Sequence, residues 1–105
     1  MSIKLDESTK AAIAIKTART ALGINQLKFA EMMGVAKTTL ARVETLEAQV
    51  KLDFYIRAVK LIESLGVELD AVRGEDIVIT IKPTAQHKFV ETMADDENRR
   101  SDKKK

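Results

Sequence analysis

The sequence contains no cysteine and a single proline, and only 4% of its 105 residues are aromatic. Without cysteine the chain has no disulfide, no thiolate metal site and no cysteine nucleophile, as expected for a reducing compartment. A chain that is 45% hydrophobic but poor in aromatic residues favours a helical domain over a β-sandwich. No apolar run approaches the roughly 20 residues of a membrane span, and the first residues lack an apolar signal segment. The sequence therefore predicts a soluble, cytoplasmic and mainly α protein.

Residues that carry catalytic chemistry are also scarce. His87 is the only histidine and follows Pro83 in a polar segment, with no second imidazole or thiolate to complete a metal site or a nucleophile–base pair. Adjacent acids occur at residues 75–76 and 95–97, in a predicted turn and a charged tail where water surrounds the carboxylates. No phosphate loop of the GxxxxGK kind is present. We expect no enzymatic activity, no cofactor and no bound metal.

The net charge of +2 hides an asymmetry along the chain. Residues 1–60 carry 10 Lys or Arg and 6 Asp or Glu, a difference of +4, whereas residues 61–105 carry 8 and 10, a difference of −2. A surface suited to a polyanion is therefore expected in the first part of the chain. An ordinary solvated helical surface would give the same balance, so charge alone does not decide the function.

Four helices are predicted in the first 66 residues. Ser8 or Thr9 caps the first helix, which stops at Gly23, and Asn25 is a suitable N-cap for the second. Gly34 supplies the positive φ of a sharp turn before the third helix. The predicted ranges are about 8–22, Gln26–Met33, Lys37–Glu44 and about 53–65.

After Gly66 the hydrophobic period changes from helical to alternating. VELDAV alternates, RGED has turn chemistry and IVITI is β-branched, so residues 67–82 are predicted to form a small hairpin or one strand. Because a lone hairpin is marginal in water, IVITI needs a partner, either its own helical domain or the same strand of a second chain. Residues 83–105 have mixed charges and few apolar residues, and we expect them to be mostly disordered, with a short helix around residues 88–93. The expected organisation is a domain at 1–66, a β element at 67–82 and a tail at 83–105.

The stretch NQLKFAEMMGVAKTTLARVE at residues 25–44 has the spacing of a helix-turn-helix. Ala30 is small where the helices cross, Gly34 permits the turn, and Leu40 and Val43 face inward. Together with LGINQ at residues 22–26, the terminal Glu44 and LIESLGV at residues 61–67, this stretch resembles the Cro and phage-repressor (xenobiotic-response-element) family of DNA-binding proteins. The resemblance covers about residues 15–67 and implies a four- to five-helix Cro/repressor-like domain.

The resemblance also implies which residues meet DNA. Arg42 is the strongest candidate for reading bases, because its guanidinium can bond guanine O6 and N7 together. Lys37 can also donate to guanine, although Lys37 and Thr39 suit phosphate contacts equally well. The predicted base-contacting residues are Ala36, Lys37, Thr38, Thr39 and Arg42. The predicted phosphate-contacting residues, at the positive end of the second helix, are Asn25, Gln26 and Lys28.

Three further features follow from the resemblance. Arg19 and Glu44 match an arginine and a glutamate that commonly form a structural pair in this family; the alternative is two unrelated surface charges. The stretch ETLEAQVKLD at residues 44–53 lacks the usual turn glycine, so either the third helix continues or the loop is extended. By analogy with relatives that dimerise through added strands, the predicted dimerisation residues are Ile77, Val78, Ile79 and Ile81.

The predicted function is sequence-specific regulation of transcription, by a repressor that binds a palindromic operator in double-stranded DNA as a homodimer. A second hypothesis is an antitoxin, in which the C-terminal part captures a toxin partner while the helix-turn-helix represses the shared operon. A third is a helix-turn-helix fold that no longer binds DNA. Substituting Arg42 and Lys37 discriminates among them, because only operator binding requires a loss of sequence preference.

Overall fold

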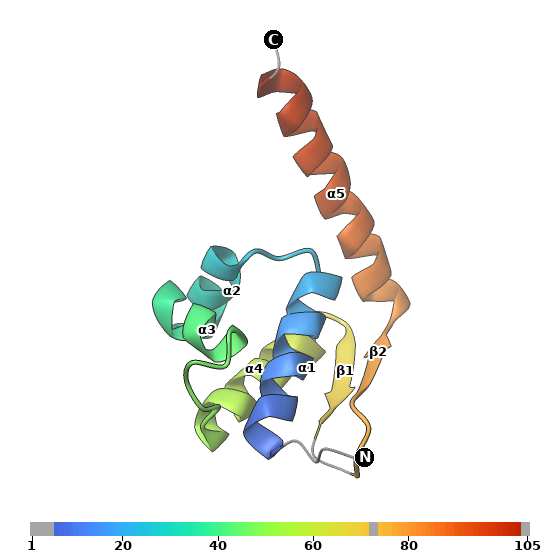
Figure 1. Cartoon of the computed structure of the whole chain (residues 1–105). Coiled ribbons are helices and arrows are strands. Elements are labelled where there is room, and N and C mark those ends of the chain that lie inside the picture. Colours follow the sequence, from blue (N-terminus) through green and yellow to red (C-terminus); the bar gives the residue numbers. More distant parts are fainter. Residues whose placement is uncertain (1–5, 72–73, 104–105) are drawn as a thin grey trace, which may run out of the picture.

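The computed structural model describes residues 6–71 and 74–103, and the side chains of residues 6–71 and 74–95. These ranges contain the helices α1 (Glu7–Ala21), α2 (Gln26–Met33), α3 (Lys37–Glu44), α4 (Leu52–Ser64) and α5 (Pro83–Lys103), and the strands β1 (Val67–Asp70) and β2 (Val78–Ile81). Helices α1 to α4 form a compact body, a hairpin of β1 and β2 lies against it, and α5 projects away (Figure 1). The prediction of a mainly α fold with a small β element is confirmed.

The start of α1 differs from the sequence prediction. Asp6 is the N-cap, and its carboxylate accepts a hydrogen bond of 2.7 Å from the backbone N–H of Thr9. Ser8 and Thr9, the predicted caps, lie inside the helix because Asp6 already provides a good acceptor ahead of them. The Ser8 Oγ instead accepts a 2.7 Å bond from the N–H of Val50, which ties α1 to the loop before α4.

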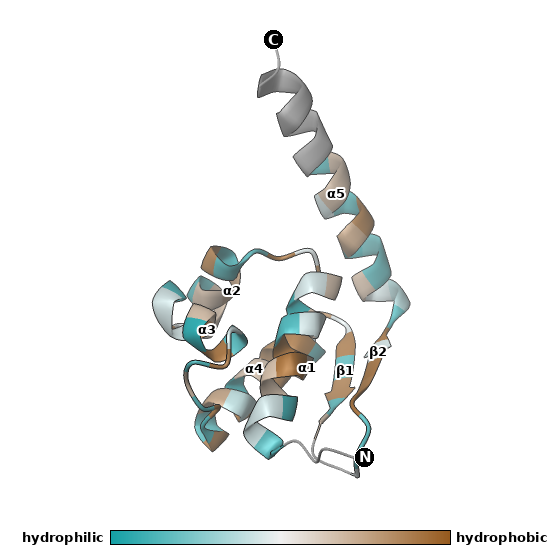
Figure 2. Ribbon diagram, viewed as in Figure 1, coloured by the Kyte–Doolittle hydropathy of each residue, from teal (hydrophilic) through white to brown (hydrophobic). Residues whose placement is uncertain are grey.

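The hydrophobic core lies where the first four helices converge, and β1 closes one side of it. Its largest fully buried side chains are Ile15, Leu22, Phe29, Leu40, Ile62 and Val67. Figure 2 shows hydrophobic residues in brown in the middle of α1 and along both strands. Each such side chain contributes about 1.5–3 kcal/mol on burial, so this core fixes the relative placement of α2 and α3.

The strands β1 and β2 pair antiparallel within the chain. Val67 lies opposite Ile81 and Leu69 opposite Ile79; Val67, Leu69 and Ile79 pack on the helices, whereas Ile81 is 40% exposed. The other face carries Glu68 and its neighbours, with a salt bridge of 2.6 Å from Glu68 to Lys82. Of the arrangements that the sequence left open, the structure has the hairpin packed on its own domain.

The segment after the hairpin differs from the expectation of a mostly disordered tail with a short helix at 88–93. The structure has one continuous helix from Pro83 to Lys103. Proline is favoured in the first turn of a helix, and no glycine or second proline follows it. Ala85 is fully buried against the body, which anchors the first turn. No helix within the described ranges is both long enough and apolar enough to cross a membrane.

Candidate nucleic-acid interface

Helices α2 and α3 are joined by a three-residue turn that depends on Gly34. Asn25 caps α2 by accepting a 2.8 Å hydrogen bond from the N–H of Lys28, and α2 ends at Met33, followed by the C-cap Gly34 with φ of 75°. The N–H of Val35 then donates to the carbonyl of Ala30 at 2.9 Å. Because Ala30 is small and only 1% exposed, the two helices can cross closely, as in helix-turn-helix proteins.

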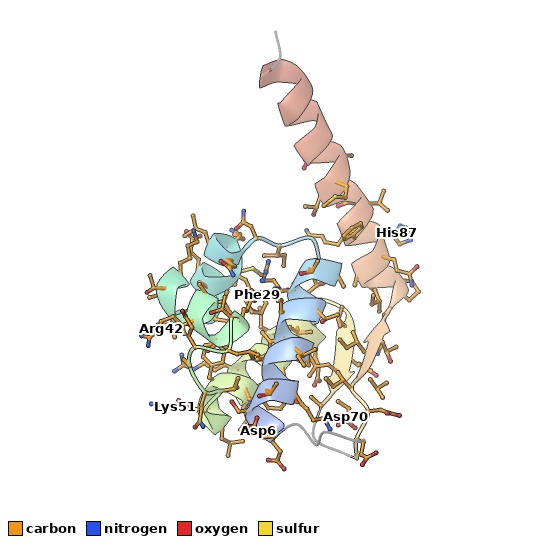
Figure 3. All side chains as sticks on the ribbon, in the orientation of Figure 1. Asp6, Phe29, Arg42, Lys51, Asp70 and His87 are labelled. Atoms are coloured by element: carbon orange, nitrogen blue, oxygen red, sulfur yellow. The ribbon has the colours of Figure 1, made fainter. Side chains whose placement is uncertain are left out.

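Helix α3 presents one buried and one exposed face. Leu40, Val43 and Glu44 are buried against α1 and α2. The exposed residues at its start and on its outer face are the predicted base-contacting set, namely Ala36, Lys37, Thr38, Thr39 and Arg42. Figure 3 shows Arg42 pointing away from the body. Ala36 makes no side-chain capping bond, so the first N–H groups of α3 face outward without a side-chain partner of their own helix.

The inner side of α3 is held by an ionic network. The Nε of Arg19 donates to Glu44 Oε2 at 2.7 Å, and Nη2 donates to Oε1 at 2.8 Å. Arg19 Nη1 also donates to the carbonyl of Ile24 at 2.7 Å, and Gln26 Nε2 donates to Glu44 Oε1 at 2.9 Å. The network therefore joins α1, the α1–α2 loop, α2 and α3, and it fixes the angle at which α3 is presented.

The predicted phosphate-contacting residues lie together at the start of α2 but differ in freedom. Asn25 and Lys28 are exposed, and the Asn25 amide nitrogen remains available because only its Oδ1 acts as the cap. Gln26 is half-buried and uses one amide hydrogen on Glu44, which leaves one for a ligand. The sequence did not predict this contact, since glutamine at a helix start suits capping or solvent equally well.

The loop after α3 resolves the question raised by ETLEAQVKLD. Helix α3 ends at Glu44, and Leu46 adopts φ of 66°, a left-handed conformation that glycine usually occupies. The N–H groups of Glu47 and Ala48 both donate to the carbonyl of Arg42, at 2.8 and 3.1 Å, and close the turn. The extended loop thus begins directly after Glu44, and the recognition helix stays short.

Three of the predicted dimerisation residues lie in β2, and Ile77 directly precedes it; they differ in burial. Ile79 packs against the core, and Ile77 is half-buried. Val78 and Ile81 are 55% and 40% exposed. No group of His, Asp and Glu within the described residues is arranged to hold a metal ion, and His87 lies exposed on α5 (Figure 3).

A short α2, a tight glycine turn and an outward polar α3 over a buried ionic network define a helix-turn-helix DNA-binding domain. The model of the helix-turn-helix family matches residues 15–72, which is more than half of the chain. The chain therefore belongs to the Cro/C1-type helix-turn-helix family, whose members are DNA-binding regulators of transcription. Searches of curated proteins and of solved structures found no match. The match includes β1, whereas β2 and α5 lie outside it.

Proposed function

We propose that this protein is a cytoplasmic transcriptional repressor that binds a palindromic operator as a homodimer, with one α3 in each of two successive major grooves. The observation that carries the proposal is the outer face of α3, where short polar and basic side chains stand exposed on a helix fixed from behind by Arg19 and Glu44. A major groove admits one α-helix, and residues at the start of that helix meet the base edges.

The side chains of α3 suit distinct tasks in the groove. Arg42 bonds guanine O6 and N7, and Lys37 donates to a guanine or to a phosphate. Thr38 and Thr39 offer a hydroxyl and a methyl group, and the Ala36 methyl contacts a thymine methyl. Asn25, Gln26 and Lys28 at the start of α2 hold the backbone phosphate that sets the register of α3.

The outer edge of β2 supports the homodimer. The N–H of Lys82 donates to the Gly66 carbonyl at 2.9 Å. Because bonded and non-bonded pairs alternate in an antiparallel hairpin, the backbone groups of Thr80 and Val78 also point toward β1. The backbone groups of Ile79 and Ile81 face away from β1, toward the free edge of the hairpin. At this edge the carbonyl of Ile81 accepts a 2.9 Å hydrogen bond from Gln86 Nε2. Pairing this edge with the same edge of a second chain would give a continuous four-stranded sheet.

Repression by exclusion of polymerase is the simplest mechanism for such a dimer. The two recognition helices would lie about one helical turn of DNA apart, roughly 34 Å, and the operator would be a matching inverted repeat.

A second function, capture of a toxin, is favoured by one surface that lies mostly on residues outside the family match. A hollow of about 340 Å³ is lined by Ala21, Ile81, Gln86, Phe89 and Val90. Val90 is 66% exposed and Met93 38% exposed, so the base of α5 presents apolar surface to solvent. Co-purification of one unrelated protein with the full chain, abolished by Val90→Glu, would support an antitoxin. The absence of such a partner from cells that express the operon would contradict it.

The primary proposal is tested by the affinity of the purified protein for DNA upstream of its own gene, measured with excess competitor DNA. Arg42→Ala is expected to lower the preference for this fragment over random DNA by about 1–3 kcal/mol, the worth of one bidentate base contact. The control is Lys51→Ala, which removes an exposed charge outside α3 and should leave the preference unchanged. An unchanged preference in the double variant Lys37→Ala, Arg42→Ala would refute this assignment.

A further inference from the structure

A second hollow, of about 550 Å³, separates α2 from the base of α5. We call it the α2–α5 hollow. Its apolar lining comes from Leu22, Gly23, Ile24, Met32 and Leu65, and its polar lining comes from Asn25, Lys28, Lys88 and Thr92. The hollow thus opens beside the start of α2, where Asn25 and Lys28 stand.

The backbone at Gly23, which has φ of 72°, packs on α5. A Cβ built on Gly23 would lie 3.4 Å from Phe89, 3.5 Å from Thr92 and 3.6 Å from Met93, so the bare backbone lies against the face of α5. Lys88 and Thr92 are four residues apart and share a helix face. The packing of α5 on Gly23 therefore directs this face toward the hollow.

Two uncompensated cations line the hollow. Lys28 and Lys88 are both exposed, and no carboxylate of the described residues forms an ion pair with either ammonium group. The Asn25 amide nitrogen adds polar hydrogens, whereas the single hydrogen of the Thr92 hydroxyl is donated to the carbonyl of Lys88 at 2.9 Å. Two positive charges on one concave surface, with no acidic residue in its lining, attract an anion.

We infer that Lys88 binds a backbone phosphate of the operator next to the one held by Asn25 and Lys28, so that α5 extends the DNA-binding surface beyond the helix-turn-helix. The inference rests on the proposed function, because it places DNA against the start of α2. A lysine that contacts a phosphate neutralises its charge and releases a counterion, without reading the sequence. Lys88 therefore contributes affinity on any sequence and no selectivity.

The test is the salt dependence of DNA binding by the full chain, measured for Lys88→Gln on an upstream fragment and on random duplex of equal length. The slope of log Kobs against log salt is expected to be shallower by about 0.9 on both duplexes, the loss of one phosphate contact. Lys88→Arg, which keeps the charge, should restore the wild-type slope. An unchanged slope in Lys88→Gln overturns the inference.

Lys82→Gln is the matched control for net charge. In the wild-type protein the Lys82 ammonium group forms an ion pair with Glu68 at 2.6 Å, and Lys82 does not line the α2–α5 hollow. It should leave the slope at the wild-type value, whereas an equal change in Lys82→Gln and Lys88→Gln would mean only a general charge effect and would overturn the inference. A wrong proposed function would give a different result from a wrong inference about Lys88, since the wild-type protein would then show no preference for the upstream fragment at any salt concentration.

Discussion

Arg19 of α1 and Glu44 of α3 form a bidentate ion pair, 2.7 Å from Nε to Oε2 and 2.8 Å from Nη2 to Oε1, although 25 residues separate them in the sequence. The side chain of Glu44 is 1% exposed and that of Arg19 is 12% exposed. Because Glu44 is the last residue of the recognition helix, this pair links the core of the domain to the orientation of the surface that meets DNA.

Removing the arginine should strongly destabilise the protein. Arg19→Ala leaves the Glu44 carboxylate buried with only the Gln26 amide as a side-chain partner, and the expected loss is about 3–5 kcal/mol in the free energy of unfolding. Urea denaturation followed by circular dichroism measures this loss. The double variant Arg19→Met, Glu44→Leu should recover most of it, because a well-packed apolar pair leaves no buried charge. A loss below about 1 kcal/mol in Arg19→Ala, typical of an exposed pair, would contradict the account.

The glycines at positions 34 and 66 should respond differently to alanine. Both have positive φ, 75° and 97°, but a Cβ at Gly34 would meet no atom within 4 Å, whereas a Cβ at Gly66 would lie 3.0 Å from the backbone nitrogen of Ala85. Gly34→Ala should therefore cost about 1–2 kcal/mol for the left-handed conformation alone. Gly66→Ala should cost more and displace the start of α5, as thermal unfolding and amide exchange of α5 would report. Equal costs would show that the contact with α5 adds nothing.

The N-cap of α1 should make stability depend on pH in acid. The pKa of Asp6 lies below its ordinary 3.8 because the backbone N–H and the hydroxyl of Thr9 donate to its carboxylate. A group with a lowered folded-state pKa stabilises the fold above pH 3.8 and loses that contribution as the pH falls through the folded value. Asp6→Asn keeps a capping acceptor that does not titrate. The stability difference between wild type and Asp6→Asn should therefore shrink as the pH is lowered below 3.8; a difference independent of pH would contradict this role.

Charges on the outer face of β2 should weaken a dimer formed through that strand. Val78→Lys with Thr80→Lys places lysines opposite Asp70 and Glu68 of the same chain, which favours the hairpin, but sets like charges against each other between two paired copies. We expect this variant to be monomeric by sedimentation. The control Val78→Gln with Thr80→Gln should remain dimeric. A dimeric lysine variant would refute pairing through β2.

Local chemistry in the sequence was sufficient to predict the central elements. Asn25 and Gly34 bracket α2, and their capping roles follow from side-chain and backbone preferences that tertiary packing did not override. The same holds for the inward Leu40 and Val43 of α3, which the spacing of apolar residues identified. These features define the exposed surface of α3 as well, because the buried face leaves only one set of residues outside.

Contacts between distant segments could not be predicted from the residues alone. The ion pair of Arg19 and Glu44 was expected only from the family resemblance, since neither charge is distinguished locally. The residues around Gly23 did not predict the packing of α5 on this glycine, because the contact involves Phe89 and its neighbours, more than sixty positions away in the sequence. The helix α5 was underestimated for the same reason: its composition is polar, and the contacts that attach it to the body, such as the buried Ala85 and the packing of Phe89 near Gly23, join distant segments.

Selection of bound sequences from a pool of random duplexes tests the central claim most directly. We predict that the wild-type protein enriches an inverted repeat with half-sites about one helical turn apart, and that each half-site holds a guanine whose enrichment disappears in Arg42→Ala. Failure to enrich any sequence, or enrichment of the same guanine by Arg42→Ala, would contradict the account of α3 as the helix that reads the operator.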